Sequence, residues 1–196
     1  MKISVGVSNR HVHLKQSDLE VLFGEGYELH NAGDLTQPGM FKAEEVVTIK
    51  TDKSEIKNVR VIGPTRMYTQ IEISKTDSYK LGLNPPIRNS GDLMGSEEIT
   101  VIGPKGEIKT NGCIIATRHI HLTEEQMKYY KLEGKDSVNV LLPGIKGGII
   151  TNVYLRTSDN SFFELHIDTD DANAHMIKNG DIVEVIEDWK NLIDKA

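Results

Sequence analysis

The pentapeptide Arg10-His11-Val12-His13-Leu14 recurs near the middle of the chain as Arg118-His119-Ile120-His121-Leu122. Each copy alternates polar with branched apolar residues, which is the pattern of a half-buried β-strand. Side chains at positions i and i+2 of a strand point to the same face. The two histidines of each copy therefore project together, while the branched residues face the other way. The repeat predicts the same histidine-bearing strand built twice.

Two imidazoles side by side on a rigid strand suit a metal ion such as zinc. A single His-x-His could equally be a polar solvent face, but a second copy flanked by the same residues favours metal binding. By strand parity Arg10 and Arg118 fall on the apolar side, where we expect a structural role such as a buried ion pair. The histidines outside the motif and its partners, His30 and His175, are expected to be ordinary surface residues.

A pair of histidines leaves a metal short of ligands, because catalytic zinc usually takes three from the protein. In the segment 162–168 the apolar residues alternate with Glu164, His166 and Asp168, which predicts a polar face carrying these three. The same parity separates Glu72 from its two isoleucine neighbours. His166 and Glu72 are the candidates to complete the two sites, with solvated strand residues as the alternative.

The overall composition sets limits on the class of protein. A chain of 196 residues suits one large domain or two small ones. The net charge of −6 argues against non-specific nucleic-acid binding, although a local group of arginines can still attract an anion. With Cys113 as the single cysteine there is neither an intramolecular disulfide nor a cysteine metal cluster. No signal-peptide core or membrane-length apolar run is visible, so we expect a cytosolic protein without a membrane partner.

The expected secondary structure is dominated by short strands. Ser17 and Glu20 have capping-box spacing for a first helix that ends at Gly24, and Thr123 and Gln126 repeat that spacing after the second motif. Strands are expected over residues 2–8, 45–51, 55–62, 69–74, 137–142, 148–157, 162–168 and 181–187. Many short strands and few helices favour small β-barrels over a parallel α/β sheet.

Three arginines occupy turns or strand ends, where they could meet an anionic substrate. Arg66 follows a Gly-Pro turn, Arg88 lies in a proline-bounded loop, and Arg156 comes near the end of a predicted strand. The planar guanidinium binds phosphate or carboxylate through two parallel hydrogen bonds. For each arginine alone, a surface ion pair is the alternative. Cys113 sits in an apolar strand and is expected to be a small buried residue rather than a nucleophile.

Several ordered motifs resemble one known family, the PduL-type phosphate acyltransferases, also called phosphotransacylases or phosphate propanoyltransferases. The resemblance covers nearly the whole chain. Its motifs are Ser8-Asn9-Arg10-His11-Val12-His13-Leu14, Leu35-Thr36-Gln37-Pro38-Gly39, Gly63-Pro64-Thr65-Arg66, Gln70-Ile71-Glu72-Ile73-Ser74, Pro86-Ile87-Arg88-Asn89-Ser90-Gly91, Arg118-His119-Ile120-His121-Leu122 and His166-Ile167-Asp168-Thr169-Asp170.

The resemblance implies a mainly β fold of two small barrels capped by short helices, with a metal site at their junction. One barrel would be formed by residues 10–116, the other by residues 1–9 plus 117–196. It further implies two metal ions, normally zinc. The implied ligand sets are His11, His13 and Glu72 for one ion, and His119, His121 and His166 for the other.

The implied activity is reversible transfer of an acyl group between coenzyme A and inorganic phosphate, giving an acyl phosphate. The expected mechanism is metal-assisted direct attack by phosphate without an acyl-enzyme. Arg66 would contact phosphate, with Arg88 and Arg156 as second contacts. A dinuclear metal hydrolase and a non-catalytic protein stapled by metal are the alternatives. The sequence leaves open which acyl chain is preferred and whether the protein forms a homo-oligomer.

Members of this family that are packaged in bacterial microcompartments often carry an amphipathic N-terminal extension. This chain starts directly at its first predicted strand. The expectation is therefore a cytoplasmic protein outside a microcompartment.

Overall fold

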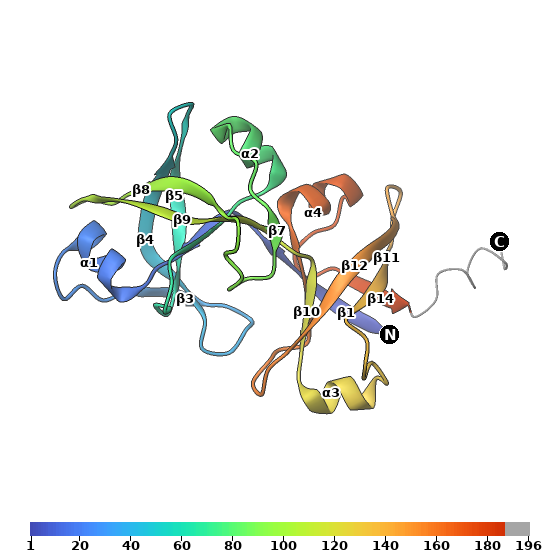
Figure 1. Cartoon of the computed structure of the whole chain (residues 1–196). Helices are drawn as coiled ribbons and strands as arrows, with labels where there is room; N and C mark the ends of the chain where they lie inside the picture. Colours follow the sequence, from blue (N-terminus) through green and yellow to red (C-terminus); the bar gives the residue numbers. More distant parts are fainter. Residues whose placement is uncertain (187–196) are drawn as a thin grey trace. The chain divides into compact units, whose positions relative to one another are not determined.

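A computed structural model describes residues 1–186, which form fourteen strands and four short helices (Figure 1). The chain divides into two compact units. Unit 1 consists of Met1–Ser8 and the chain from Thr117 onward, and unit 2 is Asn9–Ala116. Within the described residues, no helix is long and apolar enough to cross a membrane.

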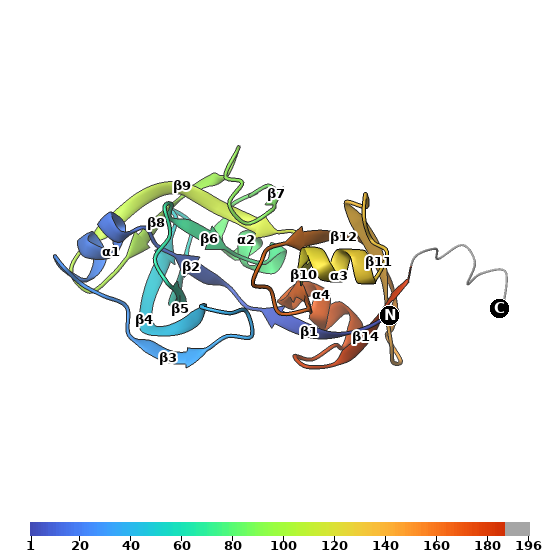
Figure 2. The ribbon, with the colours of Figure 1, turned by 90° about the horizontal axis from the view of Figure 1, so that it is seen from below.

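Unit 1 is a closed barrel of six strands in the ring order β1-β13-β10-β12-β11-β14. Helix α4 lies against β13 and β1 (Figure 2). The elements of this unit are β1 (Lys2–Ser8), β10 (His119–Leu122), α3 (Glu124–Tyr129), β11 (Ser137–Leu142), β12 (Gly148–Thr157), β13 (Glu164–Asp168), α4 (Thr169–His175) and β14 (Ile182–Ile186).

Unit 2 contains a second ring of six strands. Its sheet runs β3-β4-β5-β2-β6-β9-β7, and β8 pairs with both β4 and β9, so that β4-β5-β2-β6-β9-β8 closes on itself. Its elements are β2 (His11–His13), α1 (Gln16–Phe23), β3 (Asn31–Asp34), β4 (Phe41–Lys50), β5 (Glu55–Gly63), β6 (Gln70–Glu72), α2 (Lys75–Leu81), β7 (Ile87–Arg88), β8 (Glu97–Ile102) and β9 (Glu107–Ala116). The predicted mainly β fold of two small barrels is confirmed.

The two rings share one pairing pattern. Strand β2 is parallel to β5 and antiparallel to β6, and β10 is likewise parallel to β12 and antiparallel to β13. In chain order β2-β4-β5-β6-β8 matches β10-β11-β12-β13-β14. The sixth strand of each ring directly precedes, in the chain, the ligand strand of the other ring: β1 belongs to the ring of unit 1 and leads into β2, while β9 belongs to the ring of unit 2 and leads into β10. If each repeat is taken to start at β1 or at β9, its first strand is therefore part of the other repeat's barrel.

Each barrel is filled by its own hydrophobic cluster. The apolar residues of the two pentapeptides belong to these clusters: Val12 and Leu14 in unit 2, and Ile120 and Leu122 in unit 1, are all fully buried. Alternation along a strand then turns the histidines away from the apolar core. The pattern that fills the barrel also presents the candidate ligands.

The arginine that begins each pentapeptide connects the ligand strand to a helix through an ion pair. Arg10 Nε donates to Asp77 at 2.8 Å, and Arg118 donates through Nε and Nη2 to Asp171 at 2.6 Å for each bond. Asp77 and Asp171 are the third residues of α2 and α4, where a carboxylate also favours the helix N-terminus. The expected ion pairs are present, with both arginines partly exposed.

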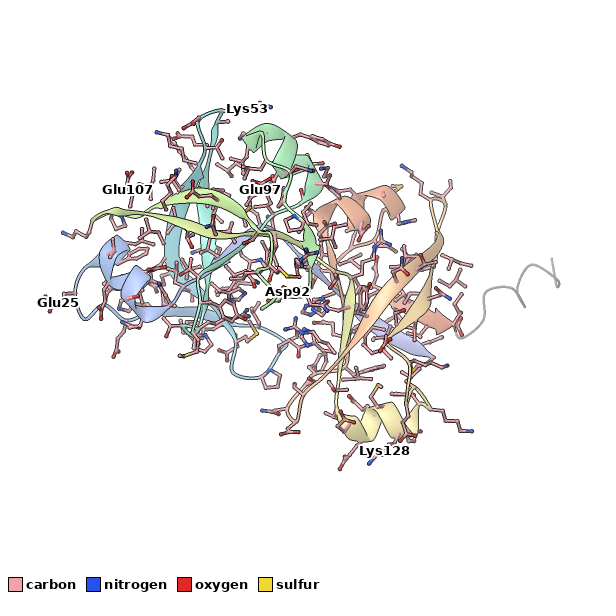
Figure 3. All side chains as sticks on the ribbon, in the orientation of Figure 1. Glu25, Lys53, Asp92, Glu97, Glu107 and Lys128 are labelled. Carbon is pink, nitrogen blue, oxygen red and sulfur yellow. The ribbon has the colours of Figure 1, made fainter. Side chains whose placement is uncertain are left out.

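The predicted boundaries hold for β1, β11 and β12. The predicted hairpin, whose outer end carries Lys53 (Figure 3), is present, but its first strand begins at Phe41 rather than at residue 45 and its second strand ends at Gly63. The capping box at Thr123 and Gln126 is present. The last strand was expected over 181–187; it occupies Ile182–Ile186, and residue 187 lies outside the described part.

The capping box predicted at Ser17 is wrong. Helix α1 starts two residues earlier than that box implies, with Lys15 at the N-cap and without a side-chain cap. The Thr69 hydroxyl explains the shift, because it accepts from the Lys15 backbone N–H at 3.1 Å and donates to the Asp18 carboxylate at 2.6 Å. A residue distant in the sequence thus holds the helix start.

Two helices were not predicted. The expected strand 69–74 is only Gln70–Glu72, because Ser74 caps α2. The expected strand 162–168 begins at Glu164, and its last residue, Asp168, caps α4. The loop that holds Arg88 contains the two-residue strand β7. Both helices are seven residues long, too short for a clear apolar period.

The Arg10–Asp77 pair should contribute measurably to stability, because the buried Asp77 carboxylate accepts a charge-assisted hydrogen bond from Arg10. We expect Asp77→Asn, which preserves shape, to lower the free energy of unfolding by about 1–3 kcal/mol in urea titrations. Glu98→Gln is the matched control: its 2.6 Å pair with Lys109 is largely exposed, so its loss should change the free energy of unfolding much less than Asp77→Asn does. Equal losses in the two variants would contradict this account.

Candidate functional site

The first candidate centre lies in unit 2, on neighbouring strands. His11 and His13 come from β2, and Glu72 comes from β6, where it is paired in register with His11. One ligand atom from each of the three residues lies within 4.8 Å of the others. His11 Nε2 is 3.5 Å from Glu72 Oε2, and the two imidazole rings are perpendicular at 5.0 Å. The third residue proposed from strand parity is thus brought to the histidine pair.

Backbone carbonyls fix the tautomers of these histidines. His11 Nδ1 lies 2.8 Å from the carbonyl of Asn9, and His13 Nδ1 lies 3.2 Å from that of Ile62. A carbonyl only accepts, so in the neutral form of each ring Nδ1 carries the proton and Nε2 keeps its lone pair. Burial, followed by the charges of His11 and Arg66, lowers the pKa of His13. A neutral imidazole is the form that binds a metal.

The second candidate centre lies in unit 1 and is built the same way. His119 and His121 come from β10, and His166 comes from β13, in register with His119. Their ligand atoms also lie within 4.8 Å of one another. His119 Nδ1 faces the carbonyl of Thr117 at 2.8 Å, which turns its Nε2 toward His121 Nε2 at 3.1 Å. Ring nitrogens that face each other so closely fit a shared cation.

Strand register makes the two centres equivalent position by position. Glu72 stands opposite His11 as His166 stands opposite His119. One step further, Gln70 stands opposite His13, and Glu164 stands opposite His121. The first set therefore contains a carboxylate where the second contains a third imidazole. Both sets could hold a metal ion; the expected position at a junction of the barrels stays a prediction.

The second centre also depends on a glycine that the sequence analysis did not single out. Gly6 on β1 is paired in register with His166. A Cβ at this position would lie 2.8 Å from His166 Cδ2 and 2.9 Å from Glu164 Oε2, closer than such atoms normally approach. Glu164 in turn lies 2.7 Å from His166 Nε2. The glycine leaves the space that these two side chains fill.

Arg66 is anchored next to the first centre. Its backbone N–H donates to the carbonyl of Leu14 at 2.8 Å, immediately after the histidine pair. Its Nη1 donates to the Ser90 hydroxyl at 3.1 Å, and the guanidinium lies 6.0 Å from the centre of the Tyr68 ring. The positive charge of Arg66 helps to lower the pKa of His13, which places this cation within electrostatic reach of the ligands.

The other two predicted arginines differ from Arg66. Arg88 donates through Nε to the carbonyl of Met94 at 2.9 Å and lies 3.6 Å from Asp92, so it braces its own loop. Arg156 is paired in register with His121 on the neighbouring strand and therefore shares a face with a candidate ligand. A substrate contact by either residue stays a prediction.

The histidines outside the two centres are not among the described ligand groups. His175 is half-buried, with Nδ1 facing the carbonyl of Lys146. His30 is exposed, but its Nδ1 lies 2.8 Å from the carboxylate of buried Glu45. That hydrogen bond raises the pKa of His30. It is thus a paired surface residue, a detail that sequence spacing did not show.

Cys113 lies in β9 and is fully buried, as predicted. Burial raises the pKa of its thiol to about 12. At neutral pH the thiolate is then a negligible fraction, and the thiolate is the nucleophilic form.

Comparison with known proteins gives a consistent result. A family model described as phosphate propanoyltransferase matches residues 4–178. A phosphate propanoyltransferase from Thermotoga maritima is 50% identical over 187 residues, covering 94% of this chain and 89% of the relative. Relatives of the same name from Rhodopseudomonas palustris and Salmonella typhimurium are 43% and 42% identical. They cover 94% and 88% of this chain, and 82% of each relative.

Proposed function

Because the chain belongs to the phosphate propanoyltransferase family, we propose that it transfers an acyl group reversibly between coenzyme A and inorganic phosphate. Membership makes it a phosphate acyltransferase. The observation that carries the proposal for this chain is local: Arg66, a cation suited to phosphate, is anchored beside a centre of two histidines and a carboxylate.

The proposed cofactor is zinc, with two ions per chain. His11, His13 and Glu72 would hold one ion; His119, His121 and His166 would hold the other. Nitrogen and carboxylate donors suit zinc, and a set of three protein ligands leaves a position for substrate. When bound, such ions supply Lewis acidity that stabilises negative charge on a coordinated thiolate or oxygen.

Arg66 is proposed to hold phosphate for direct attack on the thioester carbonyl. Its guanidinium can grip two phosphate oxygens, which orients the attacking oxygen and offsets negative charge in the transition state. The new C–O bond forms first and gives a tetrahedral intermediate; the C–S bond then breaks, and its electron pair leaves with the sulfur of coenzyme A. Acyl phosphate and coenzyme A are the products, so atoms balance without a covalent intermediate on the protein.

Cys113 supports a mechanism without an acyl-enzyme. A buried thiol with a pKa of about 12 is a poor nucleophile at neutral pH. The proposal therefore assigns the attack to phosphate itself. Arg88 and Arg156 are retained as proposed secondary contacts with substrate.

One assay tests this function. Acyl-CoA is mixed with phosphate across acyl lengths; free coenzyme A is followed with a thiol reagent, and acyl phosphate is trapped as a hydroxamate. We expect both products to appear together and only when phosphate is present. Release of coenzyme A without phosphate would instead favour a hydrolase, and no turnover with any acyl length would favour a metal-stapled binding protein.

The two ligand sets predict about two zinc ions per chain. Elemental analysis of protein purified without chelator should show this, and combining His11→Ala with His119→Ala should remove most of the metal. His175→Ala is the matched control and should leave metal content unchanged, because His175 lies outside both ligand sets. Metal content insensitive to the double substitution would refute the assignment.

The mechanism also predicts opposite outcomes at Arg66 and Cys113. Arg66→Lys keeps the charge but loses the planar fork, so kcat/KM should fall about 10- to 1000-fold. Its metal content should be retained, since Arg66 is not a proposed ligand.

Cys113→Ser should retain most activity, because the thiol receives no acyl group in the proposed reaction. Steady-state kinetics of both variants provide the measurement. An inactive Cys113→Ser beside a nearly normal Arg66→Lys would indicate a covalent acyl-cysteine instead.

A further inference from the structure

A buried amide connects the candidate ligand Glu72 to the loop that carries Ser90. Gln70 is fully buried on β6, two residues before Glu72. Its Nε2 donates to Glu72 Oε1 at 2.6 Å and to the Ser90 hydroxyl oxygen at 2.7 Å. Its Oε1 accepts from the backbone N–H of Gly91 at 2.8 Å. The loop can be followed in Figure 3, where Asp92 is labelled.

The chemistry of these partners fixes the orientation of the amide. The Gly91 N–H can only donate, so it must face the carbonyl oxygen of Gln70. The two amide hydrogens are then directed to Glu72 and Ser90. A flipped amide would set its oxygen against the Glu72 carboxylate and leave the Gly91 donor facing another donor. In a buried position each mismatch would be costly.

Ser90 links Gln70 to Arg66 through hydrogen bonds. Its hydroxyl oxygen accepts from Gln70 Nε2 and, at 3.1 Å, from Arg66 Nη1. The cation of Arg66 and the carboxylate of Glu72 are thus linked through two neutral side chains. A direct pair between them would be bidentate in its best geometry and would occupy the same fork that phosphate needs.

We propose that Gln70 and Ser90 are positioning residues that hold the Arg66 guanidinium beside the first centre while keeping it from pairing with Glu72. The bridge engages Nη1, which also lies 3.5 Å from the Tyr68 hydroxyl, so an oxyanion would bind along the Nε–Nη2 edge of the guanidinium. Naming that oxyanion as inorganic phosphate rests on the proposed function. At the position equivalent to Gln70, unit 1 carries Glu164, whose carboxylate contacts the candidate ligand His166 directly. The neutral bridge is therefore a feature of the first centre.

The test measures binding of inorganic phosphate to zinc-loaded protein by isothermal titration calorimetry. Ser90→Ala should weaken phosphate binding about tenfold, the scale of one lost hydrogen bond, with zinc content retained. Ser90→Thr restores a hydroxyl and should recover most of the affinity. Gln70→Glu keeps the acceptor for Gly91 but replaces the donor by a charge that attracts Arg66, so it should weaken binding at least as much.

A double-substitution cycle separates positioning from direct contact. If Ser90 acts through Arg66, adding Ser90→Ala to Arg66→Ala should weaken binding by less than about twofold more. Additive losses would mean that Ser90 contacts phosphate itself and would overturn the proposal. Ser78→Ala is the matched control: its buried hydroxyl donates to the carbonyl of Lys75 at 2.7 Å within α2, and phosphate affinity should not change.

The acyl-transfer assay on the same protein distinguishes this inference from the proposed function. Wild-type protein that binds phosphate in a Ser90-dependent way but forms no acyl phosphate would refute the function and leave the bridge intact. Normal acyl transfer with unchanged phosphate affinity in Ser90→Ala would refute the bridge and leave the function intact. Wild-type zinc protein that does not bind phosphate would also refute the bridge.

Discussion

Alternation along a β-strand is the constraint on which the rest of this structure depends. In each pentapeptide it buries two branched residues in a barrel core and turns two imidazoles to the opposite side. A one-residue slip would exchange those faces and lose both the core and the ligand pair. The closed rings fix the register because each ligand strand is paired on both sides. The ligand geometry is thus specified by the same contacts that stabilise the fold.

The arginine at the head of each motif extends this constraint to the helices. Arg10 and Arg118 reach the third residue of the helix that follows the strand bearing the third candidate ligand. A short helix gains little from its own hydrogen bonds, so the ion pair and the cap fix where it begins. Strand and helix are thereby locked together around each centre.

Much of this arrangement could be predicted from sequence because it is local or repeated. The period of two in the motif located four candidate ligands, and parity alone proposed Glu72 and His166. The start of α1 could not be predicted, because it depends on Thr69, more than fifty residues away. Gln70 and Gly6 could not be predicted as site residues for a similar reason. The contact of Gln70 with Glu72 and the close approach of Gly6 to His166 depend on how the strands pair and fold.

The exchange of first strands has a consequence for the order in which the barrels form during synthesis. All six ring strands of Asn9–Ala116 leave the ribosome in one continuous stretch, so this barrel can close early. Strand β1 is made first, yet its partners β13 and β14 are among the last segments made. Until then its edges are unpaired, a state that invites association with other chains. The first strand to be synthesised, β1, is thus among the last to be paired in its barrel.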